Sequence, residues 1–355
     1  LSQARGRVGV MNEKSENTQH PLTPSATVLE RVHVDNPGGL TLGRARSVGA
    51  LTLVPVFHDG PAADYVPYAS IQGAGLLEVT EVTGGGQVNT LVAQNRADQP
   101  VLLLEGEILE GMQQTRVLNI TILVPAKTTL KIPVSCVEAG RWRHDGMAAA
   151  KHEFHMSPRA RSRKSQTVAA SVRQMGAYMS DQAEVWASVD DELAAHDLQA
   201  PTRAQSDIGK AKRGEIAHDL EQLEPRPGQT GVVAVVGGKP VCFDLFDRAA
   251  TLEAVWHGLV GSYALDAMTV TRRAAAERDS AVGRKWLSML TMSTATEHPG
   301  VGLGVNVVLS SHSAGATSLV VDDAVVHLAA FATEGGAGFA RPSRRARHAD
   351  DQVLY

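Results

Sequence analysis

Short segments of alternating or β-branched residues follow one another between Thr27 and Trp142, and they limit the possible folds more than any other feature of the chain. Turn-forming residues separate these segments, which are LTLVPVF, GLLEVTEV, VNTLVAQN, PVLLLEGEIL, TRVLNITILVP and LKIPVSCVE. Such strands bury their apolar side chains by packing sheet on sheet or by forming a strongly curved sheet. We therefore expect residues 27–145 to be rich in β-strands.

Residues 146–335 combine helical spacing with further strand patterns. Val168, Val172 and Met175 recur at intervals of three and four residues, as apolar side chains do on one face of a helix. Farther along the chain, GVVAVVGG and KPVCFDLF flank a Gly-Gly turn and predict a hairpin. Two helical patterns and three strand patterns follow it. The predicted fold class is α+β, with one composite domain over residues 27–335.

Both ends of the chain lack hydrophobic periodicity. Residues 1–26 are predicted to be a disordered lead-in, and residues 336–355 a disordered basic tail. The arginines of the tail could contact an acidic partner, although a solvated tail is the simpler interpretation. A second basic run, PRARSRK at 158–164, is expected to be an exposed linker or the start of a helix.

Composition argues against several classes of protein. The formal net charge is −4 and aromatic residues make up 4% of the chain, so a nucleic-acid partner is not expected. The chain contains two cysteines, which favours a reducing compartment over a secreted disulfide scaffold. It has no apolar stretch of about 20 residues, as a membrane helix requires. We expect a soluble, cytoplasmic protein without membrane partners.

Polar side chains are concentrated in strands that are otherwise apolar. Glu105 and Glu107 are two residues apart, so on a strand their carboxylates would share one face at a distance of about 7 Å. Two such carboxylates repel each other and require a cation, a proton or a polar ligand. The other polar and aromatic residues of this predicted cluster are Gln114, Arg116, Asn119, Cys136, Glu138, Arg141 and Trp142.

The cluster has a structural and a functional interpretation. In the first, Arg116 and Arg141 form ion pairs with the glutamates, because buried charges need partners. In the second, carboxylates, guanidinium groups and an aromatic ring from separate strands form a ligand site. Cys136 is more simply a small buried side chain than a nucleophile, because no feature beside it lowers the pKa of its thiol.

Other chemical signatures are absent or weak. The chain has neither a GxxxxGK[ST] phosphate loop nor a GxSxG nucleophile motif. His152 and His155 are three residues apart around Glu153, which is not the HExxH spacing of a zinc site. His327 lies in the apolar run VVHLAAF and is expected to be a core histidine with satisfied hydrogen bonds.

Two long segments, NRADQPVLLLEGEILEGMQQTRVLNITILVPA and KIPVSCVEAGRWRH, resemble the ARG and Rhodanese-Phosphatase-superfamily-associated protein family, a domain of unknown function. Later segments also fit this family, including QAEVWASV and VVHLAAF, so that the similarity covers about residues 27–332. The family's characteristic polar positions correspond to Glu105, Glu107, Gln114, Arg116, Asn119, Cys136, Glu138, Gly140, Arg141 and Trp142.

The resemblance implies a link to ADP-ribose, because the family name records gene neighbourhoods with ADP-ribosylglycohydrolases and a rhodanese/phosphatase group. One hypothesis is therefore an enzyme, a hydrolase of ADP-ribose-like or related phosphorylated nucleotides. Arg116 and Arg141 could bind a pyrophosphate through paired hydrogen bonds. Trp142 could stack on a base, and Glu138 could act as the general acid or base.

The identity of any cofactor stays open. Glu105 and Glu107 could bind ribose hydroxyls, or a divalent metal through their oxygen atoms. The alternative to an enzyme is a non-catalytic nucleotide-binding or scaffolding module that uses the same residues. The sequence does not decide between these functions.

Overall fold

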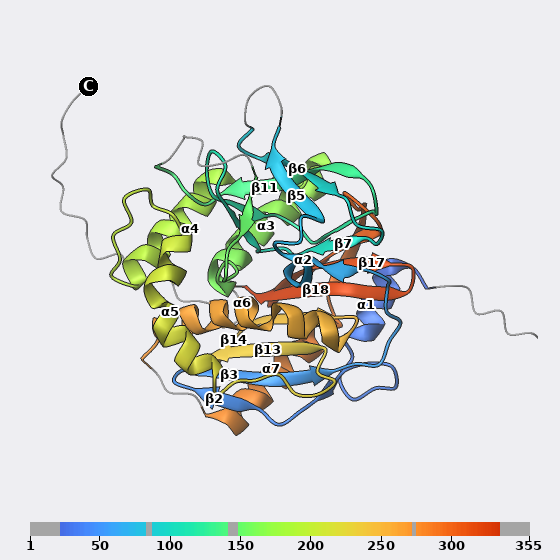
Figure 1. The fold of residues 1–355 in the computed structure, drawn as a ribbon. Coiled ribbons are helices and arrows are strands. Elements are labelled where there is room, and N and C mark those ends of the chain that lie inside the picture. The colour runs from blue at the N-terminus through green and yellow to red at the C-terminus, as the bar shows by residue number, and fades with distance from the viewer. Residues whose placement is uncertain (1–21, 83–86, 141–147, 272–274, 334–355) are drawn as a thin grey trace, which may run out of the picture.

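The α+β class predicted from the sequence is confirmed in the computed structural model, which describes residues 22–82, 87–140, 148–271 and 275–333. Its largest element is a nine-stranded antiparallel sheet with the order β1-β3-β13-β14-β18-β17-β16-β15, in which β2 also pairs with β3 (Figure 1). Its strands are β1 (Thr41–Leu42), β2 (Arg46–Val48), β3 (Leu51–Phe57), β13 (Gly231–Val236), β14 (Lys239–Phe246), β15 (Thr294–Pro299), β16 (Val305–Ser310), β17 (Ala314–Val321) and β18 (Ala324–Ala332).

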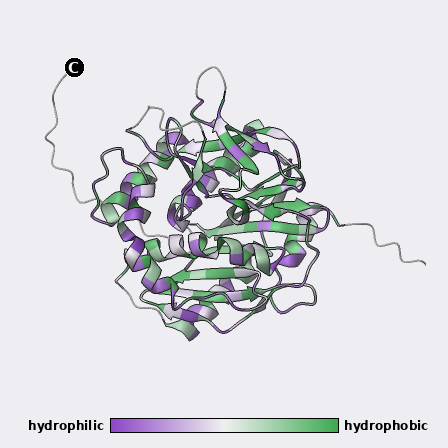
Figure 2. Cartoon of the chain, viewed as in Figure 1, coloured by the Kyte–Doolittle hydropathy of each residue, from purple (hydrophilic) through white to green (hydrophobic). Residues whose placement is uncertain are grey.

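Helices cover both faces of this sheet. Val232 and Ala234 of β13 share a core with α6 (Ala249–Met268), whereas Val233 and Val235 share a core with α7 (Ala276–Leu290). This alternation follows from the two-residue period of side chains along a strand. Helix α1 (Pro24–Arg31) lies on the same side as α7. Because both faces are buried, the strands are apolar along most of their length, as their colour in Figure 2 shows.

A second, smaller β layer is built from the N-terminal half of the chain. It contains a six-stranded sheet of order β12-β8-β9-β11-β6-β5 and a three-stranded sheet of order β10-β7-β4. The strands are β4 (Val66–Pro67), β5 (Leu77–Glu81), β6 (Thr90–Asn95), β7 (Val101–Leu103), β8 (Ile108–Glu110), β9 (Arg116–Leu118), β10 (Ile122–Val124), β11 (Thr129–Cys136) and β12 (Ala150–Lys151). Many short strands with turns between them are what the sequence pattern predicted.

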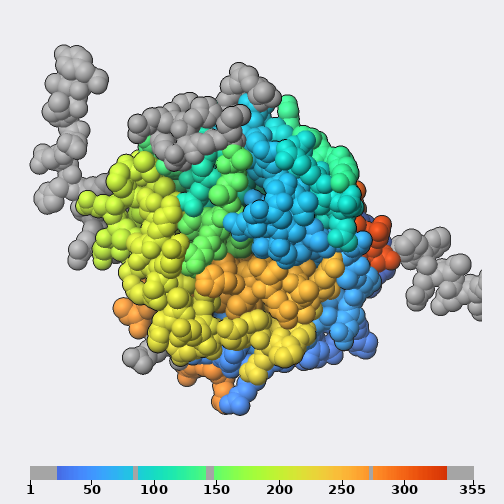
Figure 3. Space-filling model, viewed as in Figure 1, coloured from blue at the N-terminus to red at the C-terminus, as the bar shows by residue number. Residues whose placement is uncertain are grey.

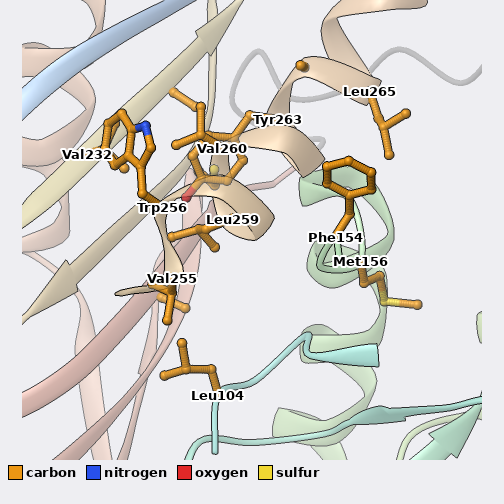
Figure 4. Close-up of a cluster of buried hydrophobic side chains, with 14 of the residues drawn as sticks. Leu104, Phe154, Met156, Val232, Val255, Trp256, Leu259, Val260, Tyr263 and Leu265 are labelled. Carbon is orange, nitrogen blue, oxygen red and sulfur yellow. The ribbon is translucent and has the colours of Figure 1, made fainter. Parts of the chain in front are cut away.

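The remaining helices are α2 (Tyr68–Ile71), α3 (Pro158–Met175), α4 (Gln182–Ala195) and α5 (Ser206–Leu220). In the space-filling view, α6 forms an orange band between the two β layers (Figure 3). Gly261 allows α6 to approach its neighbours closely, because a Cβ at this position would lie 2.5 Å from Cδ1 of Phe154. Phe154 and Leu104 belong to the same apolar core as α6, which Figure 4 shows in close-up. No helix in these described ranges is both long and apolar enough to cross a membrane.

The predicted hairpin, both later helices and the final strands are confirmed, and α1 and β15 are among the elements that differ from expectation. Helix α1 begins at Pro24, inside the predicted lead-in, because the Thr23 hydroxyl accepts a hydrogen bond from Ala26 N and caps it. Strand β15 was not predicted, since it is an edge strand with mostly exposed side chains and no apolar alternation. Residues 1–21 and the predicted tail at 336–355 lie outside the described residues.

The basic run at 158–164 forms the first two turns of α3, so the predicted helix start is confirmed. Its expected exposure is wrong, because five of the seven residues are buried and the other two are partly buried; Arg161 and Lys164 are fully buried. These side chains point from α3 toward carboxylates of both β layers. A buried cation of this kind is stable only where anionic partners compensate for its lost hydration.

Candidate functional site

The predicted polar cluster is divided among several places in the structure. Glu105 and Glu107 do not share a strand face, as was predicted, because they lie in the turn between β7 and β8. Gly106 between them has a φ of 85°, a left-handed conformation that interrupts the strand. The two carboxylates therefore face different partners.

Glu105 is bound by two cations from α3. Its Oε2 accepts a hydrogen bond of 2.8 Å from Arg161 Nε, and its Oε1 lies 2.7 Å from Lys164 Nζ. Burial alone would raise the pKa of Glu105, but the two cations outweigh burial and hold the pKa below its ordinary value. The structural interpretation thus applies to Glu105, although its partners are not the predicted Arg116 and Arg141.

Arg161 extends this ion network to the large sheet. Its guanidinium donates two hydrogen bonds to Asp244 on β14, at 3.1 and 2.7 Å. The Tyr263 hydroxyl also donates to Asp244, at 2.5 Å. Despite complete burial, Arg161 and His327 hold the pKa of Asp244 well below its ordinary value. We call Glu105, Arg161, Lys164 and Asp244 the buried ion network.

His327 confirms the prediction of a core histidine with satisfied hydrogen bonds. Its Nε2 lies 3.2 Å from Asp244 Oδ1, and its Nδ1 lies 2.7 Å from Thr121 Oγ1. The ring also stacks on Phe246 with 4.7 Å between centroids. The histidine therefore connects the buried ion network to the second β layer.

The buried charge of Glu107 has no cation as close as those that bind Glu105. One carboxylate oxygen accepts a hydrogen bond of 3.0 Å from Leu104 N. The other oxygen lies 3.8 Å from Lys151 Nζ and 3.9 Å from His155 Nε2, beyond direct hydrogen bonding. Burial raises the pKa of Glu107 and lowers the pKa of His155 well below its ordinary value. Glu107 therefore has no direct hydrogen bond to Lys151 or His155 among the described contacts.

Four predicted residues do converge where β9 and β11 run side by side, and we call Gln114, Arg116, Cys136 and Glu138 the β11 cluster. Gln114 Oε1 accepts hydrogen bonds from Arg116 Nη1 at 3.0 Å and from Cys136 Sγ at 3.2 Å. Its Nε2 donates to the Glu138 carbonyl at 3.1 Å. The amide of Gln114 therefore connects all four residues.

The reactive groups of the β11 cluster are restrained. Burial raises the pKa of the Cys136 thiol, so the thiol is protonated at neutral pH. Glu138 Oε2 accepts two hydrogen bonds from Thr115, from the backbone N at 2.9 Å and the hydroxyl at 2.8 Å. Gln182 of α4 pairs with the backbone of Cys136 through bonds of 2.9 and 2.7 Å. The sequence spacing of Gln182 did not indicate this contact.

Three further residues were predicted to bind a ligand, and none of them belongs to the β11 cluster as defined here. Asn119 donates to the Tyr178 carbonyl at 2.9 Å and accepts from Ser135 at 2.5 Å, which fixes the segment after α3 to β11. Arg141 and Trp142 lie outside the described residues. The described chain before them ends at Gly140, whose N donates to Thr202 O at 2.8 Å.

Sequence reasoning missed a pair of buried carboxylates, Glu192 on α4 and Asp266 on α6. Gln205 donates to Glu192 at 2.8 Å, and Arg159 N donates to Asp266 at 2.9 Å. Burial, then the neighbouring Asp266, raises the pKa of Glu192 to about 7. Burial raises the pKa of Asp266 to about 6 against the opposing effect of Arg159. Acidic residues on helices with no special spacing gave no signal for this pair.

The pair predicts a pH-dependent stability. Because the folded protein binds these protons more tightly than the unfolded chain does, their contribution is fully present below about pH 4 and is lost as the pH rises to about 7. Glu192→Gln removes one such group, so it should raise the urea midpoint at pH 8 relative to the wild type and leave a smaller difference at pH 5. Glu184→Gln, at a more exposed position of α4, should leave the urea midpoint unchanged at both pH values. Equal midpoint shifts at both pH values in Glu192→Gln would contradict the assignment.

A divalent metal bound by Glu105 and Glu107 was one of the two alternatives left open by the sequence. Within the described ranges, no group of three or more His, Cys, Asp or Glu side chains is arranged to hold a metal ion. Glu105 is instead bound to Arg161 and Lys164. The arrangement of Glu105 therefore does not fit a divalent metal shared with Glu107.

The fold and these clusters define an α+β protein with a large antiparallel sheet and a charged interior. The family model described as ARG and Rhodanese-Phosphatase-superfamily-associated Protein domain matches residues 39–331. The chain therefore belongs to this family, as the two long segments indicated. Neither a search of curated proteins nor a search of solved structures found a match.

Proposed function

We propose that this protein binds an ADP-ribose-like or related phosphorylated nucleotide at the β11 cluster, together with Arg141 and Trp142. One observation carries the proposal. The Arg116 guanidinium at the start of β9, the Gln114 amide just before it and Glu138 just after β11 converge in a buried cluster, three residues before Arg141 and Trp142 follow in the chain. Guanidinium groups bind pyrophosphate oxygens through paired hydrogen bonds, and an indole stacks on a base.

The family name supports the same ligand class. It associates the domain with an ARG group and with a rhodanese/phosphatase superfamily, and the resemblance of the sequence to this family implied a link to ADP-ribose. Such nucleotides are intracellular metabolites, and both cysteines of the chain are free thiols. A cytoplasmic location is therefore part of the proposal.

Two features of the β11 cluster favour binding over hydrolysis. A nucleophilic cysteine must be a thiolate, but burial raises the pKa of Cys136. A general acid or base needs a carboxylate that is free to reach the substrate, but Glu138 is held by two hydrogen bonds from Thr115. We therefore place the non-catalytic nucleotide-binding module ahead of the hydrolase.

Calorimetric titration with ADP-ribose tests the proposal. We expect saturable binding by the wild type, and a rise in stability of about 2.7 kcal/mol at a ligand concentration 100 times Kd. Arg141→Ala should weaken binding by roughly tenfold or more, because a charge-assisted hydrogen bond is lost. Arg163→Ala, on α3 and paired with Asp191, is the control and should bind like the wild type.

Three other results of these titrations would contradict or modify the proposal. An absence of binding by folded wild-type protein would refute the proposal. Binding that is equal in Arg141→Ala and the wild type would move the site away from the β11 cluster. Product formation in the same samples, detected by chromatography and lost in Glu138→Gln, would favour the hydrolase over the binding module.

A further inference from the structure

A pocket of about 320 Å³ lies between α3 and the ends of β16, β17 and β18. Its α3 residues come from the face next to the one that carries Arg161 and Lys164, and none of the lining residues belongs to the β11 cluster. They are Ser162, Ser165, Gln166, Ala169, Arg173, Leu309, Ser310, Ser311, Ala314, Gly315, Ala316, Phe331 and Thr333.

The polar part of the pocket is suited to an anion. Five of the lining side chains are hydroxyls, one is a guanidinium, and none of the described lining residues is acidic. Arg173 Nη1 donates to Ser310 Oγ at 2.7 Å, which leaves the other N–H groups of this exposed side chain to turn toward a ligand. The Ser165 hydroxyl, on the same helix, also belongs to the lining of the pocket.

The rest of the wall is apolar. Phe331 is almost completely buried and lies on the face of the sheet that α3 covers, whereas the side chains of Leu309 and Ala314 belong to the core on the opposite face. Phe331 is fixed from another direction, because the Arg161 guanidinium lies 4.9 Å from its ring centroid. The pocket therefore offers a charged and hydroxyl-lined wall and, opposite in chemistry, the apolar ring of Phe331.

We propose that this pocket binds a phosphorylated pentose or hexose, a second ligand that is distinct from the nucleotide at the β11 cluster. Arg173 and the hydroxyls of Ser165 and Ser310 bind the phosphate oxygens, since guanidinium and hydroxyl groups are the side chains that most often do so. The sugar ring lies against Phe331. A volume of about 320 Å³ is at the small end of ligand pockets and suits one sugar phosphate better than a dinucleotide.

Titration with ribose 5-phosphate tests this proposal on the full chain. We expect saturable binding, and at least tenfold weaker binding of ribose and of inorganic phosphate, because each lacks the contacts to one wall. Arg173→Ala should weaken binding of ribose 5-phosphate by at least tenfold while the melting temperature stays unchanged, since the side chain is exposed. Arg163→Ala, on another face of α3, should leave the affinity unchanged.

A second variant fills the pocket. Ser165→Leu should abolish binding of ribose 5-phosphate, and its far-ultraviolet circular dichroism should match that of the wild type. The proposal is overturned if ribose 5-phosphate does not bind, if inorganic phosphate binds as tightly, or if Arg173→Ala retains the full affinity. ADP-ribose binding that depends on Arg141 but not on Arg173 would separate the two sites, so that either can fail without the other.

Discussion

Arg161→Met is expected to destabilise the protein by about 3–5 kcal/mol, the largest effect of any single substitution considered. The methionine fills much of the same volume but leaves Glu105 and Asp244 without their shared cation. Both carboxylates are buried, so water cannot replace the lost hydrogen bonds. Lys164 still neutralises Glu105, whereas Asp244 retains only the hydroxyl of Tyr263 and the ring of His327.

Urea denaturation followed by circular dichroism measures this loss. Arg163→Met is the matched control, because Arg163 is on the same helix and its ion pairs with Glu184 and Asp191 are partly exposed; we expect a loss below about 1 kcal/mol. If Arg161→Met does not fold, Arg161→Lys keeps the charge with fewer donors and should give an intermediate loss. Equal losses in Arg161→Met and Arg163→Met would show that the buried ion network does not stabilise the fold.

Periodicity predicted most of the fold because most elements bury one face. The hairpin of β13 and β14 was recognised from two apolar runs around Gly237 and Gly238, which both have positive φ. Helix α6 and helix α7 were recognised from apolar side chains at helical spacing. Strand β15 lacks such a pattern, since its neighbour β16 supplies its only hydrogen-bonded edge and its side chains are mostly exposed.

The buried ion network could not be predicted from the local sequence, because its partners are 56 and 83 residues apart. We expected Glu105 to pair with arginines on nearby strands, and the structure uses a helix instead. One signal was present, however. Arg161 and Lys164 continue at helical spacing the same stripe as Val168 and Val172, which are buried. Cations on an apolar stripe indicate buried partners rather than an exposed linker.

The convergence of the β11 cluster was easier to anticipate, because β9 and β11 are close in sequence and pair directly, with Cys136 opposite Arg116. Strand alternation cannot show how such side chains hydrogen-bond. The role of Gln114, whose amide connects three neighbours, and the restraint of Glu138 by Thr115 required three-dimensional geometry. Because these contacts restrain Glu138, they favour binding of a nucleotide over its hydrolysis.

Gly106→Ala is expected to destabilise the protein by about 2–4 kcal/mol, although it adds a single methyl group. The φ of Gly106 is 85°, and a non-glycine residue in the left-handed region costs about 1–2 kcal/mol. In addition, a Cβ at this position would lie 2.8 Å from Arg161 Nε and 2.9 Å from Arg161 Cδ. The methyl group must therefore push Arg161 away from Glu105, which weakens the buried ion network.

Gly176→Ala separates these two contributions. Gly176 ends α3 with a φ of 69°, and no atom lies within 4 Å of the Cβ that would be added. Its substitution should cost only the backbone strain of about 1–2 kcal/mol. The excess loss in Gly106→Ala then measures the displacement of Arg161, and it should disappear in an Arg161→Met background, where the flexible methionine can yield. An equal loss from both glycines would mean that the turn before Glu107 constrains only the backbone. An excess loss of stability that depends on Arg161 would mean that glycine is required in this turn because the Arg161 side chain packs against it.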